Sequence, residues 1–234
     1  MMLGILGGTS FHETGLLTDG EERLVETPMG AVRVHCAGGL ALIARHGREG
    51  RTPPHSIDHH AHLTALARLG AGRIVSFGSV GSLKPELPPG TLLVPDDYFA
   101  PFRVVTFHHD RIRFTVPGFD PDWRGRVIDA LRGAELRPVT AGVYVETLGP
   151  RFETPAEVRW LATVGDVVGM TCAAEATLAR ELEIPLAAVC MVDNFAHGIG
   201  AEPLTGKAFR RSVRENRDTV ARAFRAVAAL ATAE

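Results

Sequence analysis

Short apolar runs alternate with helical patterns along most of the chain, and this alternation most narrowly limits the fold. The runs predicted as strands are "LGIL", "VRVHC", "LALIAR", "RIVSFGS", "TLLVPDDYF", "AGVYVET", "DVVGM" and "LAAVCMV". Helical patterns cover residues 57–69, 120–136, 155–162, 176–182 and 205–230. Strands separated by helices predict an α/β fold, with a mixed β-sheet flanked by helices on both faces.

Length and charge narrow the class of protein. A chain of 234 residues suits one domain, so we expect a single domain over residues 1–234. The net charge of -2 argues against binding to nucleic acid or to a membrane, because both need a concentrated excess of Lys and Arg. The start "MMLGILGGTSF" lacks the basic region of a signal peptide, and Cys36, Cys172 and Cys190 have no metal-ligand spacing. We therefore expect a cytoplasmic protein with a small-molecule partner.

Small donors and basic side chains gather where several predicted strands end. In open α/β sheets, ligands collect beyond the carboxyl ends of the strands, so these residues predict an anion-binding crevice. Alone, "GILGGTS" is as consistent with a tight turn as with an anion loop, and it matches neither a dinucleotide nor a nucleoside-triphosphate motif. Alone, "ARHGREG" favours a solvated strand end. The segment "FGSVGS", residues 77–82, reads as a glycine turn. The donors at these strand ends are Thr9, Ser10, Arg45, His46, Arg48, Ser79, Ser82 and Thr171.

A histidine cluster, "HSIDHHAHL", offers an alternative. His55, His59 and His62 would share one face of a helix, which is the basis for a metal-dependent hydrolase. Apart from Asp58, no carboxylates are close in sequence to complete such a site. Histidines at the surface or lining the crevice are therefore the favoured interpretation, and we expect no metal.

Several motifs in order resemble the trimeric nucleoside phosphorylases, a family that includes purine nucleoside phosphorylase and methylthioadenosine phosphorylase. They are "GILGGTS", "TPMG", "ARHGREG", "GSVGSL", "PGTLLVPDDYF", "LGPRFETPAE" and "VVGMTCAAEATLARELEIPLAAVCMVDN". The resemblance runs from about residue 3 to 220 and is closer to the methylthioadenosine phosphorylase branch. It implies a nucleoside phosphorylase-like fold, a homotrimer, and no metal or organic cofactor. Phosphate, as co-substrate, would cleave a nucleoside into free purine and ribose 1-phosphate.

By motif match, the resemblance also assigns residues to the site. The helix start "DHHAH" departs from the family, which has Asn and Tyr there, so His59 receives no assigned role. Phosphate would be held by Thr9, Arg45, His46, Gly78, Ser79 and Thr171. The nucleoside would contact Phe152 at the base, Met170 at the ribose, and Asn194, Phe195 and Ala196 at a strand end.

Glu153 and Asn194 bear on which purine is bound, and we expect them to be the catalytic residues. The adenine-specific branch has Asp in place of Asn194, a second Asp in place of Ala196, and commonly Ser in place of Glu153. Hypoxanthine and guanine carry an N1–H donor and an O6 acceptor, so they require one carboxylate acceptor and one amide donor. Asp193 is an alternative base reader, or a residue that orients a loop.

The expected function is phosphorolysis of the 6-oxopurine nucleosides inosine and guanosine. Relatives that read a 5'-hydroxyl have a His near the last helix, and "PLTGKAF" has none, although His197 could reach in from another loop. Without it, Leu204 would favour a 5'-methylthio group and make the chain a 5'-methylthioinosine phosphorylase. The metal-dependent hydrolase on His55–His62 and a non-catalytic nucleotide-binding module remain as alternatives of other classes.

Overall fold

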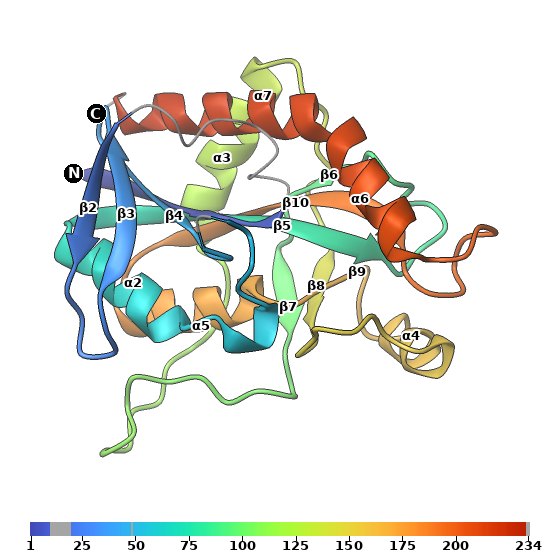
Figure 1. The fold of residues 1–234 in the computed structure, drawn as a ribbon, viewed down its shortest axis with the longest axis horizontal. Coiled ribbons are helices and arrows are strands. Elements are labelled where there is room, and N and C mark those ends of the chain that lie inside the picture. Colours follow the sequence, from blue (N-terminus) through green and yellow to red (C-terminus); the bar gives the residue numbers. More distant parts are fainter. Residues whose placement is uncertain (10–19, 48, 233–234) are drawn as a thin grey trace.

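A mixed sheet of ten strands forms the centre of the computed structural model, which describes residues 1–9, 20–47 and 49–232 (Figure 1). Its main path runs β2-β3-β4-β1-β5-β9-β8-β7, and β10 pairs with β5 and β6. Strands β4, β1, β5 and β10 are mutually parallel. The strands are β1 (Met2–Gly7), β2 (Glu21–Val25), β3 (Val32–Ala37), β4 (Leu40–Ala44), β5 (Ala71–Ser82), β6 (Leu92–Leu93), β7 (Asp97–Phe99), β8 (Val143–Glu146), β9 (Val167–Gly169) and β10 (Leu186–Phe195).

Helices cover both faces of this sheet, which confirms the predicted fold class. Helices α2 (His59–Arg68) and α5 (Cys172–Glu181) pack on one face, and α3 (Pro121–Gly133) and α7 (Arg217–Ala228) pack on the other (Figure 1). Two apolar clusters fill the spaces between the sheet and these two layers. The shorter elements are α4 (Pro155–Leu161), α6 (Gly206–Glu215), η1 (Pro54–Ser56) and η2 (Ala229–Ala231).

The predicted glycine turn at residues 77–82 is wrong, because β5 continues through it to Ser82. The two glycines of this segment allow close packing instead of a turn. A Cβ on Gly78 would lie 3.0 Å from Cys172 Sγ, and one on Gly81 would lie 3.1 Å from Asn194 Nδ2. Gly78 and Gly81 therefore let β5 carry Ser79 toward the end of the sheet while the neighbouring elements approach its backbone.

Other boundaries also differ from the prediction. The predicted strand through residues 91–99 divides into β6 and β7 around Pro95, which has no N–H for a ladder. Helix α5 begins at Cys172 rather than at residue 176, and Thr171 is its N-cap residue. The single helix predicted over 205–230 is two helices that meet at Asn216. Strand β2, which the sequence pattern missed, is an exposed edge strand without an apolar face.

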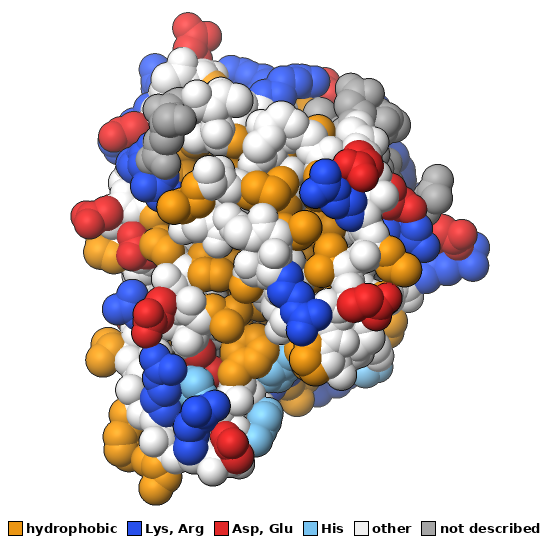
Figure 2. All heavy atoms as spheres, turned by 90° about the vertical axis from the view of Figure 1, so that its left-hand side faces the viewer, with side chains coloured by type: hydrophobic (Ala, Val, Ile, Leu, Met, Phe, Trp, Pro, Cys, Tyr) orange, Lys and Arg blue, Asp and Glu red, His pale blue; other side chains and the backbone are white. Residues whose placement is uncertain are grey.

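Charged side chains of both signs surround a central area of hydrophobic atoms on the face that carries β2 and β3 (Figure 2). Lys and Arg do not form a continuous patch on that face. Within the described ranges, no helix is both long and apolar enough to cross a membrane.

Candidate active site

A cavity of about 560 Å³ opens where five strands of the sheet end. Residues at or near the carboxyl ends of β1, β4, β5, β9 and β10 line it, together with residues from the loop between β8 and α4. The predicted site residues in its wall are Thr9, Arg45, His46, Ser79, Phe152, Glu153, Met170, Thr171, Asn194 and Ala196. The tertiary structure thus brings together residues that lie up to 187 positions apart, from Thr9 to Ala196. Ser10 and Arg48 lie outside the described residues.

Gly78 and Phe195 are not among the residues that line this cavity. Gly78 lies within β5 and, together with Gly8, lines a separate small cavity of about 10 Å³. Phe195 packs closely against Gly200, where an added Cβ would lie 2.8 Å from the Phe195 ring.

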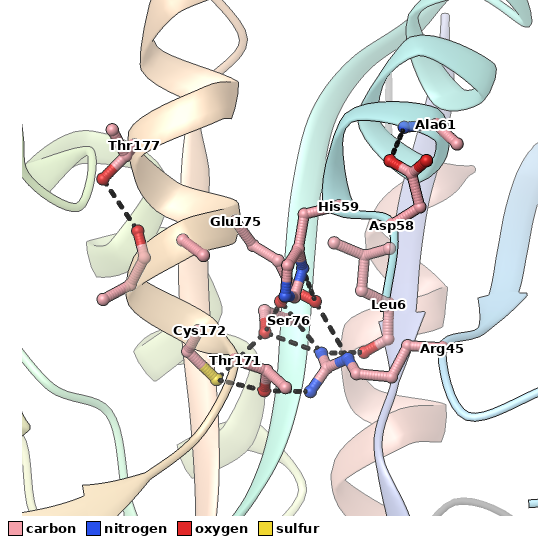
Figure 3. Close-up of polar contacts among 12 residues, drawn as sticks. Leu6, Arg45, Asp58, His59, Ala61, Ser76, Thr171, Cys172, Glu175 and Thr177 are labelled. Atoms are coloured by element: carbon pink, nitrogen blue, oxygen red, sulfur yellow. Dashed lines mark hydrogen bonds and ion pairs between the residues drawn. The ribbon is translucent and has the colours of Figure 1, made fainter. Parts of the chain in front are cut away.

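Arg45 lies at the bottom of the cavity and is only 1% exposed. Its Nη2 donates to Leu6 O at 3.0 Å and to Ser76 Oγ at 2.9 Å. Its Nη1 donates to Thr171 Oγ1 at 2.8 Å (Figure 3). A Cβ on Gly8, the residue after β1, would lie 2.6 Å from the Phe77 carbonyl oxygen and 3.3 Å from Nη1, so glycine at this position lets the loop pass close to β5 and to the guanidinium.

Glu175 is the counter-ion of Arg45, and the sequence analysis missed it. The Glu175 carboxylate forms an ion pair with one edge of the Arg45 guanidinium: Oε1 lies 2.9 Å from Nε, and Oε2 lies 3.0 Å from Nη2. Burial alone would raise the pKa of the fully buried Glu175 carboxyl, but the charge of Arg45 holds that pKa below its ordinary value. A charged residue on the inward face of α5, among Ala173, Ala174 and Ala176, was the available signal.

Ser76 and His59 also contact this ion pair, and His46 lies at the cavity wall. Ser76 Oγ donates to Glu175 Oε2 at 2.6 Å, so it bridges the carboxylate and the guanidinium (Figure 3). His59 is 2% exposed, and its Nδ1 lies 3.6 Å from Glu175 Oε1. His46 Nδ1 donates to the Thr52 carbonyl at 2.8 Å, which fixes the orientation of the ring at the cavity wall.

Glu153 and Asn194 supply a carboxylate and an amide to the same cavity. Thr147 Oγ1 donates to Glu153 Oε1 at 2.6 Å and so holds the carboxylate in place. Asn194 Nδ2 donates to the Phe195 carbonyl at 2.8 Å. Phe152 meets Phe209 of α6 edge to face, with the ring centroids 5.8 Å apart. The cavity therefore combines a buried acceptor, an amide and an aromatic wall.

Strand β10 contains a β-bulge at Asp193, directly before Asn194. The pairing of β10 with β5 shifts register between Val192 and Asn194, so Asp193 is the extra residue. Ser79 Oγ donates to Asp193 Oδ2, and Asn216 Nδ2 donates to Asp193 Oδ1 at 2.8 Å. Asp193 is therefore bound within the protein, between the cavity wall and the α6–α7 junction, whereas Asn194 lines the cavity.

Helix α6 and the segment before it form an apolar wall of the cavity. Leu204, Phe209 and Val213 line it, together with Arg210. His197 is not among the lining residues, and its Nδ1 lies 3.3 Å from the Glu153 carbonyl. The histidine considered for a 5'-hydroxyl thus contacts the main chain of the "GPRFE" segment.

The predicted shared helical face is correct for His59 and His62, which both lie in α2, but wrong for His55. His55 lies in η1, before α2 begins at His59. His60 Nε2 contacts the Thr106 carbonyl, whereas His59 faces Glu175. In the part of the chain that the structure describes, no group of three or more His, Cys, Asp or Glu side chains has the geometry to hold a metal ion.

Comparisons with known proteins agree with this geometry. The family model described as "Phosphorylase superfamily" matches residues 3–229. A probable 6-oxopurine nucleoside phosphorylase of Archaeoglobus fulgidus is 39% identical over 220 residues, covering 92% of this chain and 90% of that protein. A probable S-methyl-5'-thioinosine phosphorylase of Methanocaldococcus jannaschii is 39% identical over 212 residues, covering 87% and 82%. The solved structure of methylthioadenosine phosphorylase from Schistosoma mansoni in complex with adenine matches with a TM-score of 0.87 at 25% identity, covering 100% of this chain and 93% of that one.

Proposed function

Because this chain belongs to the phosphorylase superfamily, we propose that it is a purine nucleoside phosphorylase that cleaves the 6-oxopurine nucleosides inosine and guanosine. The observation that carries the substrate assignment is the pairing of Glu153 and Asn194 in one cavity with the Arg45–Thr171 donors. Its relative in Archaeoglobus fulgidus, named for 6-oxopurine nucleosides, supports the same class.

Phosphate binding would fall to the Arg45 side of the cavity. Arg45 Nη1 bonds one acceptor within the described residues, Thr171 Oγ1, and has a second N–H to give. Because Thr171 Oγ1 accepts from Arg45, its own hydroxyl hydrogen can donate to a phosphate oxygen. Thr9 and His46 complete this wall, and Ser79 would use its backbone N–H, since its hydroxyl is bound to Asp193.

Purine binding would fall to Glu153 and Asn194. The Glu153 carboxylate would accept the N1–H of hypoxanthine or guanine, while Thr147 occupies its other oxygen. The Asn194 amide would donate to O6 or N7. Phe152 would pack against the base plane, and its contact with Phe209 fixes that ring.

The chemistry follows from charge placement. As the N-glycosidic bond breaks, positive charge develops on the sugar and negative charge moves onto the purine. Phosphate, held below the sugar, stabilises the cation and then bonds to C1'. The amide of Asn194 stabilises the departing purine. No protein nucleophile is needed, and Cys172 is fully buried behind Thr171. This reaction also needs no metal or organic cofactor, in contrast to a metal-dependent hydrolase.

A second candidate substrate is 5'-methylthioinosine. The apolar wall of Leu204, Phe209 and Val213 favours a methylthio group over a hydroxyl, and His197 contacts the main chain instead of the cavity. The relative in Methanocaldococcus jannaschii carries the corresponding name.

Exposed apolar side chains between β7 and α3 support assembly into a homotrimer. Val104 is 92% exposed and Phe114 is 95% exposed, and Ile112 and Val116 are also exposed in the same segment. This segment extends away from the sheet at the lower edge of Figure 1. A run of exposed large apolar residues marks a surface that another protein covers. A second copy of this chain is the proposed occupant.

One substrate panel tests the proposed function. Inosine, guanosine, adenosine, 5'-methylthioinosine and 5'-methylthioadenosine are each incubated with and without phosphate, and released base is measured. We expect cleavage of the 6-oxopurine nucleosides only with phosphate and no effect of a chelator. Hydrolysis without phosphate, or inhibition by the chelator, would favour the metal-dependent hydrolase instead.

A further inference from the structure

The geometry points to Glu175 as a built-in counter-anion that keeps the phosphate subsite assembled before phosphate arrives. We propose that Glu175 neutralises and orients Arg45, so that only Nη1 of the guanidinium is left to face phosphate. Glu175 is then a positioning residue, because it acts on phosphate only through Arg45. This inference rests on the proposed function, since it assumes that phosphate binds beside Arg45 and Thr171.

The hydrogen bonds of Arg45 divide its guanidinium into two sides. The Nε and Nη2 side faces the Glu175 carboxylate at 2.9 and 3.0 Å, and Ser76 and Leu6 also bind Nη2. The Nη1 end faces Thr171 and the open cavity. An ion pair at Nε and three contacts at Nη2 hold the inner side of the guanidinium, so the N–H of Nη1 keeps one direction.

Burial makes the carboxylate necessary in the empty site. Arg45 is 1% exposed and Glu175 is fully buried, so water screens neither charge. A buried guanidinium without a partner is strongly destabilising. Between turnovers, when phosphate has left, Glu175 is the anion that remains beside Arg45.

Glu175 also limits how tightly phosphate binds. Because the Arg45 charge is already balanced, an incoming phosphate gains less attraction than it would from an isolated guanidinium. Removal of the carboxylate charge should therefore leave a less stable protein that binds phosphate more strongly, since phosphate then becomes the counter-ion of Arg45.

The experiment compares Glu175→Gln with wild type by thermal unfolding, with inorganic phosphate titrated against chloride at equal ionic strength. We expect Glu175→Gln to have a lower Tm without phosphate. At the same high phosphate concentration, the rise in its Tm should exceed that of wild type, because stabilisation by a ligand grows with the logarithm of its concentration divided by Kd. In steady-state kinetics, the KM for phosphate should fall by about tenfold, while the KM for nucleoside stays the same.

Glu146→Gln is the matched control. Glu146 is a second buried carboxylate against α5, and it accepts the N–H groups of Ala173 and Ala174 away from the cavity. The rise in the Tm of Glu146→Gln on adding phosphate should equal that of wild type. A purely structural role of Glu175 would lower the Tm and leave the phosphate shift unchanged, and this result would overturn the proposal.

Glu175→Asp covers the case in which Glu175→Gln does not fold even with phosphate. Asp keeps the negative charge but is shorter by one methylene group, so the carboxylate lies farther from Arg45. The rise in Tm on adding phosphate should therefore be larger than that of wild type. A shift equal to or smaller than that of wild type in either variant overturns the inference. If wild type itself shows neither a phosphate shift nor phosphate-dependent cleavage, the proposed function fails instead.

Discussion

Asn216 donates from Nδ2 to Asp193 Oδ1 at 2.8 Å and so joins the bulge in β10 to the junction of α6 and α7. The same carboxylate accepts from Ser79, whose backbone belongs to the proposed phosphate wall. One buried side chain therefore joins β10, β5 and the junction of α6 and α7.

Asp193→Ala should destabilise the protein and weaken nucleoside binding. The change leaves the Ser79 hydroxyl and the Asn216 amide without their acceptor, and each unsatisfied group costs about 1 to 3 kcal/mol. Urea unfolding monitors the loss, and the KM for inosine reports the displacement of α6. Asp193→Asn keeps one acceptor oxygen, so its stability and its KM for inosine should lie between those of wild type and Asp193→Ala. Unfolding at the wild-type urea concentration would show that these contacts contribute little.

Arg45→Ala should raise the KM for phosphate strongly and leave the KM for nucleoside nearly unchanged. A hydrogen bond to a charged group contributes about 1.5 to 3 kcal/mol, which corresponds to roughly 10- to 150-fold. Because the change also leaves the buried Glu175 carboxylate without its counter-ion, circular dichroism must first establish that the variant is folded. Arg45→Lys keeps the charge without the planar fork and should be intermediate. An unchanged phosphate KM would remove Arg45 from the site.

Wild type should prefer inosine over adenosine, and Asn194→Asp should erode this preference. With adenosine, Glu153 faces an unprotonated N1 and the Asn194 amide donor faces the 6-amino group. Two mismatches of about 1 to 3 kcal/mol each give roughly 30- to 10⁴-fold discrimination. In Asn194→Asp, inosine turnover should fall most, whereas adenosine gains little because Glu153 still opposes it. Equal cleavage of the two nucleosides by wild type would exclude this pair as the base readers.

Glu146 should make stability fall as the pH rises. Burial raises the pKa of this carboxyl to about 7 in the folded protein, above its ordinary 4.5. The folded state therefore holds the proton more tightly than the unfolded state does. Stability is highest below about pH 4.5 and is lost up to about pH 7, by roughly 3 kcal/mol for this group. Urea unfolding of wild type and Glu146→Gln at pH 5 and pH 8 tests this. The variant should be the more stable protein at pH 8, and an identical pH slope for both would refute it.

The wild-type protein should be a homotrimer in solution. Light scattering should therefore give a mass of about 75 kDa, three times that of the 25.1 kDa chain. Val104→Asp with Phe114→Asp should dissociate the trimer, because both side chains lie in the exposed apolar segment. Leu24→Asp is a matched control, since Leu24 is also exposed but lies on β2. A wild-type monomer with full activity would contradict the assembly.

The sequence by itself determined the architecture and most of the cavity wall. Apolar runs of strand length that alternate with helical patterns allow only a sheet with helices on both faces. Because the carboxyl ends of such strands converge, the pattern alone predicts that Arg45, Thr171 and Asn194 lie near one another. Their side-chain chemistry, read through the motif resemblance, indicated an anion next to a purine.

Only the tertiary structure decided which partners these residues have. Arg45 and Glu175 lie 130 positions apart, and no local pattern connects a guanidinium at a strand end with a carboxylate in the middle of a helix. The same holds for the straight course of β5 through Gly78 and for the bulge at Asp193, because both depend on what packs against the backbone. Local propensity is enough to select helices and strands. The pairing of buried charges depends instead on their removal from water, which happens only when the chain is folded.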